Sequence, residues 1–167
     1  MTTILKRATA ELWEFPLSGP TGGSGITAVD VIVVDLEDSD GVTGTGFSYV
    51  LGGGGKTVTH AARDMLSRFV EDQEIVPPQA LWRRLAGSLN RLGRGVGYLS
   101  IAAIDVAMWD LYSRKQGMPL YKALGGVAKT LHVYGSGGFG PMQDPDAAVE
   151  RALEYADMGC TAVKLRV

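Results

Sequence analysis

The chain has 167 residues, of which 46% are hydrophobic and 20% are charged, and its formal net charge is -2. This composition supports a packed core in one domain, or in one domain plus part of another, and it excludes a chain that is disordered throughout. Acidic and basic side chains are mixed, so no basic block indicates nucleic-acid binding. We expect no signal peptide and no membrane span, because no apolar run is long enough. The single cysteine excludes an internal disulfide, and we expect a reduced, cytoplasmic protein.

The first part of the chain predicts a meander of strands. Pro16 closes the first strand, and residues 16–26 form a flexible, glycine-rich loop. The second strand contains the β-branched run Val31–Val34. Ser39–Gly41 is a turn signal before the returning strand of a hairpin, and the glycine run 52–55 follows that strand as a second loop. The strands are expected over residues 9–15, 27–36 and 42–49.

Helices are predicted next, because apolar residues recur at helical spacing. Either Pro77 or Pro78 can open the second helix, and the glycine-rich segment 93–97 breaks it. Ser100 is a suitable N-cap for the third helix. The helices are expected over residues 57–70, from 77 or 78 to about 92, and from 101 to about 115.

After residue 129 the pattern changes to strand, helix, strand. The helix begins with Asp144 as its cap and Pro145 at its first position, and Gly159 is placed to end it in a left-handed conformation. Strands are expected over residues 131–136 and 161–167. Such a βαβ unit implies parallel strands and a right-handed crossover. The helix is expected to bury a stripe made of Val149, Ala152, Leu153 and Ala156.

The whole order, a β-meander, then helices, then βαβ, predicts an α+β domain followed by the start of an α/β domain. In the last strand, Lys164 and Arg166 share one face because side chains alternate. At the mouth of a (β/α) barrel, two such cations could bind a carboxylate and stabilise an enediolate. A solvated edge strand is the alternative, and the pattern alone favours it because parallel strands carry few charges.

Other motifs give weaker signals. The run Gly52–Thr57, GGGGKT, resembles a phosphate-binding loop, but Val50 stands where that motif requires glycine, so a mobile substrate loop is the better interpretation. His60 and His132 have no partner at metal-ligand spacing, and we expect structural roles for both. Asp105 and Asp110 are five residues apart and lie on different faces of one helix, which favours structural hydrogen bonding. We therefore expect no metal site within this chain.

Residues 100–126, SIAAIDVAMWDLYSRKQGMPLYKALGG, resemble the last helix and linker of the capping domain in the mandelate racemase and muconate lactonizing enzyme family of the enolase superfamily. The run A-x-D-x-A-x-W-D followed by G-x-P-L-Y-x-x-L-G-G is quite specific, and the order of elements agrees. The resemblance implies a capping domain over residues 1–128 and the first βαβ unit of an incomplete (β/α)7β TIM-like barrel over residues 129–167. It overturns the edge-strand interpretation of Lys164, and it implies either a fragment of a longer enzyme or an enzyme whose remainder lies elsewhere.

The resemblance also implies chemistry. Members abstract the proton α to a carboxylate and stabilise the enediolate on Mg²⁺, whose carboxylate ligands would lie beyond Val167, so we expect this chain alone to be inactive. Lys164 matches the first lysine of the family's Lys-x-Lys motif, which helps hold the carboxylate. Arg166 stands where the second lysine is the usual base. Because guanidinium is essentially always protonated, Arg166 suits carboxylate binding better than proton abstraction.

Substrate-binding residues follow from the same resemblance. Ser136 matches a position that often contacts ligand. The two capping loops correspond to residues 18–26 and 49–56, which place Thr21, Gly22 and Tyr49 among the candidates, and we expect both loops to be mobile without ligand.

The segment 44–55, GTGFSYVLGGGG, looks more like the acid-sugar dehydratases, so we expect a small carboxylate substrate, most simply an acid sugar. A racemase, an epimerase or a cycloisomerase of the same superfamily is the alternative, and a non-catalytic capping or assembly module is the alternative of another class. We expect the complete enzyme to form a homo-oligomer.

Overall fold

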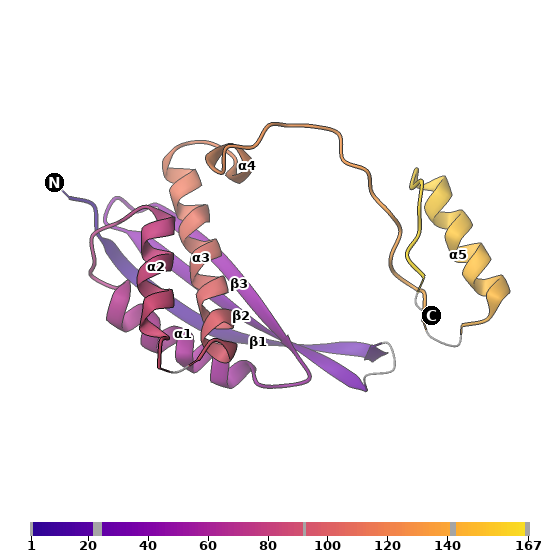
Figure 1. Ribbon diagram of the computed structural model, residues 1–167, viewed down its shortest axis with the longest axis horizontal. Helices are drawn as coiled ribbons and strands as arrows, with labels where there is room; N and C mark the ends of the chain where they lie inside the picture. Colours follow the sequence, from indigo (N-terminus) through magenta and orange to yellow (C-terminus); the bar gives the residue numbers. More distant parts are fainter. Residues whose placement is uncertain (1, 22–24, 92, 141–142, 166–167) are drawn as a thin grey trace. The chain divides into compact units, whose positions relative to one another are not determined.

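The computed structural model describes residues 2–21, 25–91, 93–140 and 143–165, and for residues 19–21 it describes the backbone alone. The chain divides into two compact units (Figure 1). The first comprises Met1–Ser18 and Ile26–Val127, and the second comprises Gly19–Gly25 and Ala128–Val167. In the described part of the chain, no helix combines the length and the apolar character needed to cross a membrane.

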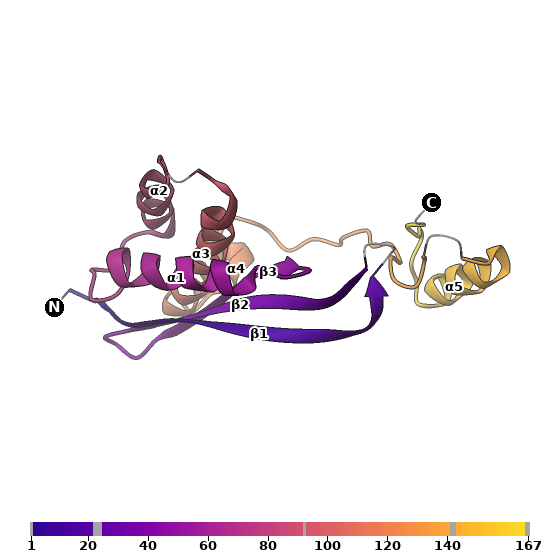
Figure 2. The ribbon, with the colours of Figure 1, turned by 90° about the horizontal axis from the view of Figure 1, so that it is seen from below.

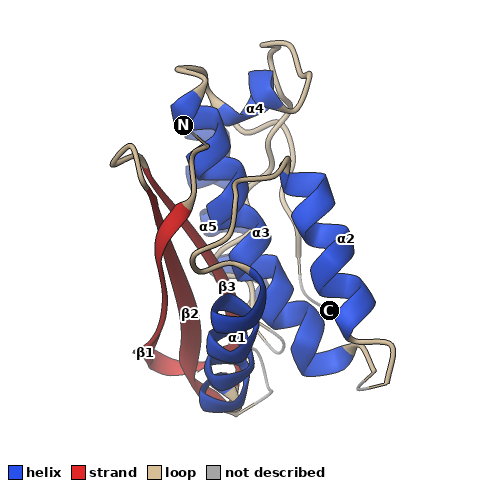
Figure 3. Ribbon diagram, turned by 90° about the vertical axis from the view of Figure 1, so that its left-hand side faces the viewer, coloured by secondary structure: helices blue, strands red, loops and turns tan. Residues whose placement is uncertain are grey.

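The first unit is a three-stranded sheet with helices on one of its faces. The strands are ordered β1-β2-β3, and β2 pairs with β3 in antiparallel register. Figures 2 and 3 show α1, α2 and α3 along one side of this sheet. This arrangement confirms the predicted β-meander followed by helices. The elements are β1 (Leu5–Thr21), β2 (Ile26–Asp38), β3 (Thr43–Leu51), α1 (Gly55–Phe69), α2 (Pro78–Ser88), α3 (Gly95–Lys115) and the single turn α4 (Leu120–Ala123).

The core lies between the sheet and the helices. Alternate residues of β3 are buried, so Gly44, Gly46 and Ser48 face the helices while Phe47 and Tyr49 lie on the outer face. Most of the largest fully buried side chains come from β2 and from the apolar face of α3, where the 3.6-residue period brings them to one side, and β1, α1 and α2 contribute the others together with Val70. They include Ile32, Val34, Leu36, Ile101, Ile104, Met108 and Leu111.

Two glycines of β3 let α3 lie directly on the strand. A Cβ added to Gly46 would be 2.2 Å from the amide nitrogen of Ala107 and 2.3 Å from the carbonyl oxygen of Ala103. A Cβ on Gly44 would be 2.4 Å from the amide nitrogen of Leu111. These neighbours are backbone atoms, which no rotamer change can move. The G-x-G pattern of β3 is therefore a packing requirement of this fold.

The β2–β3 hairpin turns over a short loop, as the sequence predicted at Ser39–Gly41. Asp38 and Val42 close the loop, with the Asp38 N–H donating to the Val42 carbonyl at 3.0 Å. Gly41 has φ 82°, the left-handed conformation that glycine adopts without strain. The Asp38 carboxylate accepts hydrogen bonds from the N–H groups of Asp40 and Val42, both at 2.9 Å, so it stabilises the turn from within.

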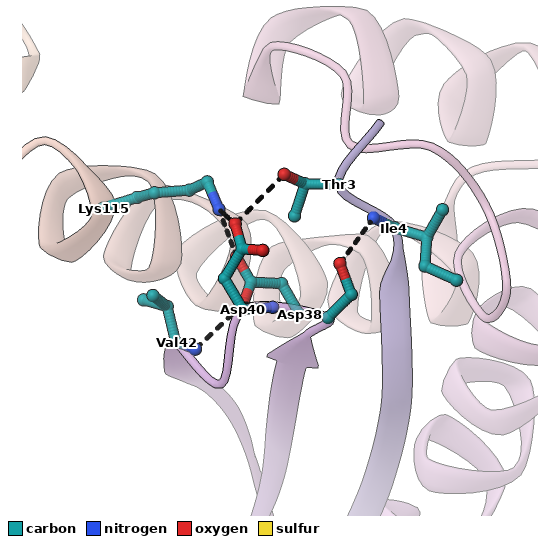
Figure 4. Close-up of polar contacts among 7 residues, drawn as sticks. Thr3, Ile4, Asp38, Asp40, Val42 and Lys115 are labelled. Atoms are coloured by element: carbon teal, nitrogen blue, oxygen red, sulfur yellow. Dashed lines mark hydrogen bonds and ion pairs between the residues drawn. The ribbon is translucent and has the colours of Figure 1, made fainter. Parts of the chain in front are cut away.

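Lys115, at the end of α3, binds this turn (Figure 4). Its Nζ lies 2.5 Å from Oδ2 of Asp38 and 2.6 Å from Oδ2 of Asp40. The Asp38 side chain is completely buried, whereas that of Asp40 is exposed. Asp40 also accepts a hydrogen bond from the Thr3 hydroxyl. The network joins the end of α3 to the hairpin and to the N-terminal segment.

The ionisation of this network sets a pH window for stability. Hydrogen bonds from Lys115 and then Thr3 hold the pKa of Asp40 below its ordinary value of 3.8. Hydrogen bonds to Asp38 and then Asp40 raise the pKa of Lys115 above its ordinary value of 10.5. The contribution of Asp40 is therefore complete above pH 3.8 and is lost as the pH falls through the lowered pKa. That of Lys115 is complete below pH 10.5 and is lost as the pH rises through the raised pKa.

We expect Lys115→Met to lower the urea midpoint at pH 7 and to weaken the loss of stability in acid, because the largest cause of the lowered pKa of Asp40 would be removed. The control is Arg114→Met, which removes an exposed pair with Asp110 and should cost only about 0.3–0.5 kcal/mol. Urea unfolding followed by circular dichroism between pH 3 and 7 measures both effects. Equal midpoints for the two variants across this range would contradict the prediction.

Two expectations for the first unit were wrong at element boundaries. The first strand, β1, begins at Leu5 rather than at residue 9, and Pro16 does not end it. It continues to Thr21, so the expected loop over residues 16–26 is strand in its first part. The physical reason is that β1 is at the edge of the sheet, where a proline nitrogen can face away from the neighbouring strand. Residues 22–24 of that loop lie outside the described residues.

The second error concerns the helices around the glycine-rich segment 93–97. The earlier helix ends at Ser88 rather than near residue 92, and α3 begins at Gly95 rather than at Ile101. Gly97 lies inside α3, where a Cβ would be 2.6 Å from the end of the Leu89 side chain, so the helix packs closely against Leu89 at this point. Ser100 is buried within the helix and does not cap it; its hydroxyl donates to the carbonyl of Val58 at 2.9 Å.

The second unit contains α5 (Pro145–Asp157), with the ends that the sequence predicted. The Asp144 carboxylate accepts the N–H of Ala147 at 3.3 Å, which is an N-cap hydrogen bond. At the other end Gly159 has φ 89° and donates to the carbonyl of Ala156, while Cys160 donates to that of Tyr155, both at 2.9 Å. This pair of bonds is the Schellman motif, so the expected left-handed termination at Gly159 is confirmed.

The expected strands over residues 131–136 and 161–167 are wrong in extent. In the described part of this unit they are reduced to one isolated parallel bridge, Gly135 with Val163. The parallel direction agrees with a βαβ unit, but a single pair of short strands is marginal without further neighbours. The expected buried stripe of α5 is also wrong, since Val149 is 58% and Leu153 is 60% exposed. The bridge and its loop are too small to cover that face.

We expect the isolated chain to self-associate, because exposed apolar side chains and unpaired strand edges promote intermolecular contacts. Replacing both Val149 and Leu153 with serine should lower the apparent mass measured by light scattering. Glu150→Ser on the same exposed helix is the control and should leave the mass unchanged. A monomeric wild-type chain at high concentration would refute this expectation.

Candidate functional site

The parallel bridge places Ser136 next to Lys164. Gly135 donates its N–H to the carbonyl of Ala162 at 3.0 Å and accepts the N–H of Lys164 at 2.8 Å. Since side chains alternate along extended chain, Tyr134, Ser136 and Lys164 lie on one face of the paired segments, and Val163 lies on the other. The two candidates that the sequence placed at separate strand ends are therefore neighbours in the structure.

Helix α5 covers the opposite face of the bridge. A Cβ added to Gly135 would lie 2.1 Å from the ring of Tyr155, so this residue must be glycine for the helix to pack as it does. Ser136 and Lys164 are exposed. The candidate site is thus the face of the pair that points away from α5.

Lys164 has an aromatic neighbour on its own face. Its Nζ lies 5.7 Å from the centre of the Tyr134 ring, within the range of a cation–π contact. At an exposed site such a contact contributes about 0.5–1 kcal/mol, enough to bias the side chain toward one position. The sequence analysis did not single out Tyr134, although its spacing of two from Ser136 would have placed it on the same face.

Two of the other candidates, Tyr49 and Thr21, belong to strands of the sheet. Tyr49 belongs to the first unit, on the outer face of β3 opposite Val31, and is 57% exposed. Thr21 is the last residue of β1. Gly22 and Arg166 lie outside the described residues. Of the predicted site residues, the structure brings Ser136 and Lys164 together.

The glycine run before α1 is organised by an acidic residue. Gly52, Gly53 and Gly54 have φ values of 76°, 104° and 102°, and the N–H of Gly55 donates to Oδ2 of buried Asp30 at 2.9 Å. This carboxylate occupies the helix N-terminus, where a phosphate-binding loop would hold its anion. The geometry therefore opposes the phosphate-loop alternative. The loop between β3 and α1 is short, and its expected mobility stays a prediction.

The remaining polar candidates have structural surroundings. Asp110 accepts hydrogen bonds from the N–H of Thr45 and from Nε of Arg114, both at 2.9 Å, as expected for a structural residue. Burial raises the pKa of Asp105 above its ordinary value. His60 and His132 are exposed. Among residues 2–21, 25–91, 93–140 and 143–165, no group of three or more His, Cys, Asp or Glu side chains could hold a metal ion.

Comparison with known proteins agrees with this architecture. Residues 10–125 match the family model of the mandelate racemase / muconate lactonizing enzyme N-terminal domain. The chain is 30% identical over 171 aligned residues to 3,6-anhydro-alpha-L-galactonate cycloisomerase of Streptomyces coelicolor, covering 98% of this chain and 46% of that protein. It is 31% identical over 148 residues to L-talarate/galactarate dehydratase of Salmonella typhimurium, covering 85% of this chain and 36% of that protein.

A solved structure extends the likeness to the fold. The crystal structure of a racemase from Streptomyces coelicolor with bound magnesium superposes with a TM-score of 0.86 at 28% identity, covering 98% of this chain and 47% of that one. The chain thus spans less than half the length of each of these three proteins. The match over residues 10–125 takes in most of the first unit. The chain belongs to the mandelate racemase and muconate lactonizing enzyme family of the enolase superfamily.

Proposed function

We propose that this chain is the N-terminal part of an enzyme that abstracts the proton α to a carboxylate, with an acid sugar as substrate and loss of water as the outcome. The observation that carries the proposal is the placement of Ser136 and Lys164 on the face of a parallel pair opposite α5. In a (β/α) barrel the helices lie outside, so the face opposite a helix is the interior, and the active site is at the carboxyl ends of the strands.

The proposal assigns two successive domains, whose bounds follow the two units except that residues 19–25 and Ala128, which cluster with the second unit, fall in the first domain. Residues 1–128 would be the capping domain, and residues 129–167 would be the first βαβ unit of a (β/α)7β barrel. The parallel bridge and the α5 cap are the parts of such a unit present in the described residues. Extension of the pair into full strands would require neighbouring strands to complete the hydrogen bonding.

Lys164 is the central catalytic group of the proposal. Its ammonium would bind the substrate carboxylate and stabilise the negative charge that develops when the α-proton leaves. Ser136 would donate a hydrogen bond to the same substrate. Arg166, two residues further on, would share the face of Lys164 and bind the carboxylate through two parallel hydrogen bonds. Because its guanidinium does not lose a proton near neutral pH, the base would be another group.

The capping residues would complete the pocket. Thr21 and Gly22 belong to one segment expected to cover the substrate, and Tyr49 lies two residues before the end of β3, which leads into the glycine run. Closing such segments excludes water and orders the substrate.

Magnesium enters the proposal through the relatives rather than through this chain. The racemase from Streptomyces coelicolor contains bound magnesium. The described residues do not fit a magnesium site, because Mg²⁺ requires convergent oxygen ligands and these residues offer no such group. The metal would need carboxylates from outside this set, and the roles of Lys164 and Ser136 do not depend on its position.

The test is a screen of acid sugars with the full-length protein in D₂O. Dehydration would appear as a 2-keto-3-deoxy acid, detected as its semicarbazone. Deuterium entering the α-position without loss of water would instead support a racemase or epimerase, and an intramolecular rearrangement would match the cycloisomerase relative. Neither exchange nor product from any acid sugar would favour a non-catalytic capping or assembly module and reject the proposal.

A further inference from the structure

We propose that Tyr155 of α5 is a positioning residue, which clamps the loop after the first strand so that Ser136 stays beside Lys164. The clamp is defined here as Tyr155 and Arg151 acting on the loop Gly137–Gly140. Its consequence for turnover rests on the proposed function, whereas the clamp itself is a property of the second unit.

The hydroxyl of Tyr155 binds both polar groups of one residue. It accepts the N–H of Gly137 at 2.9 Å and donates to the carbonyl of Gly137 at 3.0 Å. A single side chain thereby satisfies the backbone of the residue that directly follows Ser136. Losing the hydroxyl would therefore leave both polar groups of Gly137 without this partner.

The ring of Tyr155 fixes the residue on the other side of Ser136. It packs against the α-carbon of Gly135 so closely that a Cβ there would lie 2.1 Å away. The same ring contacts buried Phe139, with centroids 6.0 Å apart. Both chain neighbours of Ser136 are therefore held by one aromatic residue of α5.

Arg151 supports the ring from one turn earlier in α5. Its guanidinium lies 5.2 Å from the ring centre of Tyr155, and its Nε donates to the carbonyl of Gly137 at 3.4 Å. Its other end is held at 2.5 Å by the carboxylate of Glu154. The arginine thus reinforces the contact that the tyrosine makes with the loop.

The loop needs this support because of its composition. Three of the four residues in Gly137–Gly140 are glycine, and Gly138 has φ 84°, so the backbone has little conformational restriction of its own. In the described part of the chain no hydrogen bond engages the Ser136 hydroxyl, which leaves it free for a ligand. Clamping the backbone while leaving the side chain free is what a binding serine requires.

The experiment compares Tyr155→Phe with the full-length wild-type protein. Phenylalanine keeps the ring against Gly135 and removes only the hydroxyl. Hydrogen exchange in a peptide covering residues 135–140 should become about tenfold faster, the size expected for losing one to two hydrogen bonds. Tyr121→Phe, on exposed α4, is the matched control and should leave this peptide unchanged. Unchanged exchange in Tyr155→Phe would overturn the clamp.

Kinetics test the positioning role separately. Tyr155→Phe should raise KM for the acid sugar several-fold, with a smaller change in kcat, and Ser136→Ala should do the same. The double variant should be no worse than Ser136→Ala, because the tyrosine acts through the serine. Additive effects would reject that role. A wild-type enzyme inactive on every acid sugar would reject the proposed function and the kinetic role with it, while faster exchange would still establish the clamp.

Discussion

Gly46→Ala should destabilise the protein by about 3 kcal/mol or more, at the upper end of the cost of overpacking a core. The new methyl would lie 2.2 Å and 2.3 Å from backbone atoms of Ala107 and Ala103. Relief would require α3 to move away from β3, which would separate the buried side chains between the sheet and this helix. Gly44→Ala should behave in the same way, because its Cβ would meet the backbone of α3 one turn further on.

The control for this prediction is Gly87→Ala. Gly87 lies in α2, and a Cβ there meets nothing within 4 Å. Alanine should therefore stabilise the helix by about 0.5–1 kcal/mol, since it loses less backbone entropy than glycine. Urea unfolding followed by far-UV circular dichroism gives both values. A Gly46→Ala protein as stable as wild type would show that α3 does not rest on the β3 backbone.

The sequence predicted those elements whose signal is local. The run Val31–Val34, the turn at Ser39–Gly41 and the apolar spacing of α3 each depend on a few neighbouring residues, and the structure has a strand, a turn and a helix there. Asp144 and Gly159 likewise define the two ends of α5 through bonds that span three to five residues. Turns, helix ends and periodic apolar spacing of this kind can be predicted from the sequence without knowledge of the fold.

The errors arose where a tertiary contact decides the conformation. Gly97 was taken as a helix breaker, but it is the residue that lets α3 approach Leu89. Pro16 was taken as the end of a strand, but the edge position of β1 tolerates it. In both cases the deciding feature lies outside the element itself, and a single sequence does not reveal which residues will meet.

The residues of the candidate site also divide into those with a local signal in the sequence and those that only tertiary packing identifies. Alternation along one strand drew attention to Lys164, but the family resemblance was needed to favour a site there, and Ser136 came from the resemblance alone. Tyr155 could not, because it lies 18 residues from Gly137 and its role depends on how α5 packs on the bridge. Tyr134 has a partial signal, its spacing of two from Ser136, but the contact with Lys164 comes from pairing between distant segments.

Lys164→Met in the full-length protein should reduce exchange of the substrate α-proton with D₂O by about 10²- to 10³-fold, the usual cost of removing a preorganised electrostatic contact. Methionine preserves much of the length of the side chain and removes the charge. Lys122→Met on exposed α4 is the control and should exchange at the wild-type rate. Exchange is followed by proton NMR under single-turnover conditions, which separates proton abstraction from loss of water.

The variant Arg166→Lys distinguishes between two possible roles of residue 166, substrate orientation and proton abstraction. If Arg166 orients the carboxylate, the variant should keep proton exchange and lose affinity, because an ammonium cannot form the two parallel hydrogen bonds of a guanidinium. If the position can serve as a base, a lysine there should accelerate exchange, since an amine loses its proton more readily than a guanidinium does. Undiminished exchange in Lys164→Met would reject the assignment of this face as the active site, whatever Arg166→Lys does. A large loss in Lys164→Met together with weakened binding in Arg166→Lys would assign charge stabilisation to the first residue and substrate orientation to the second.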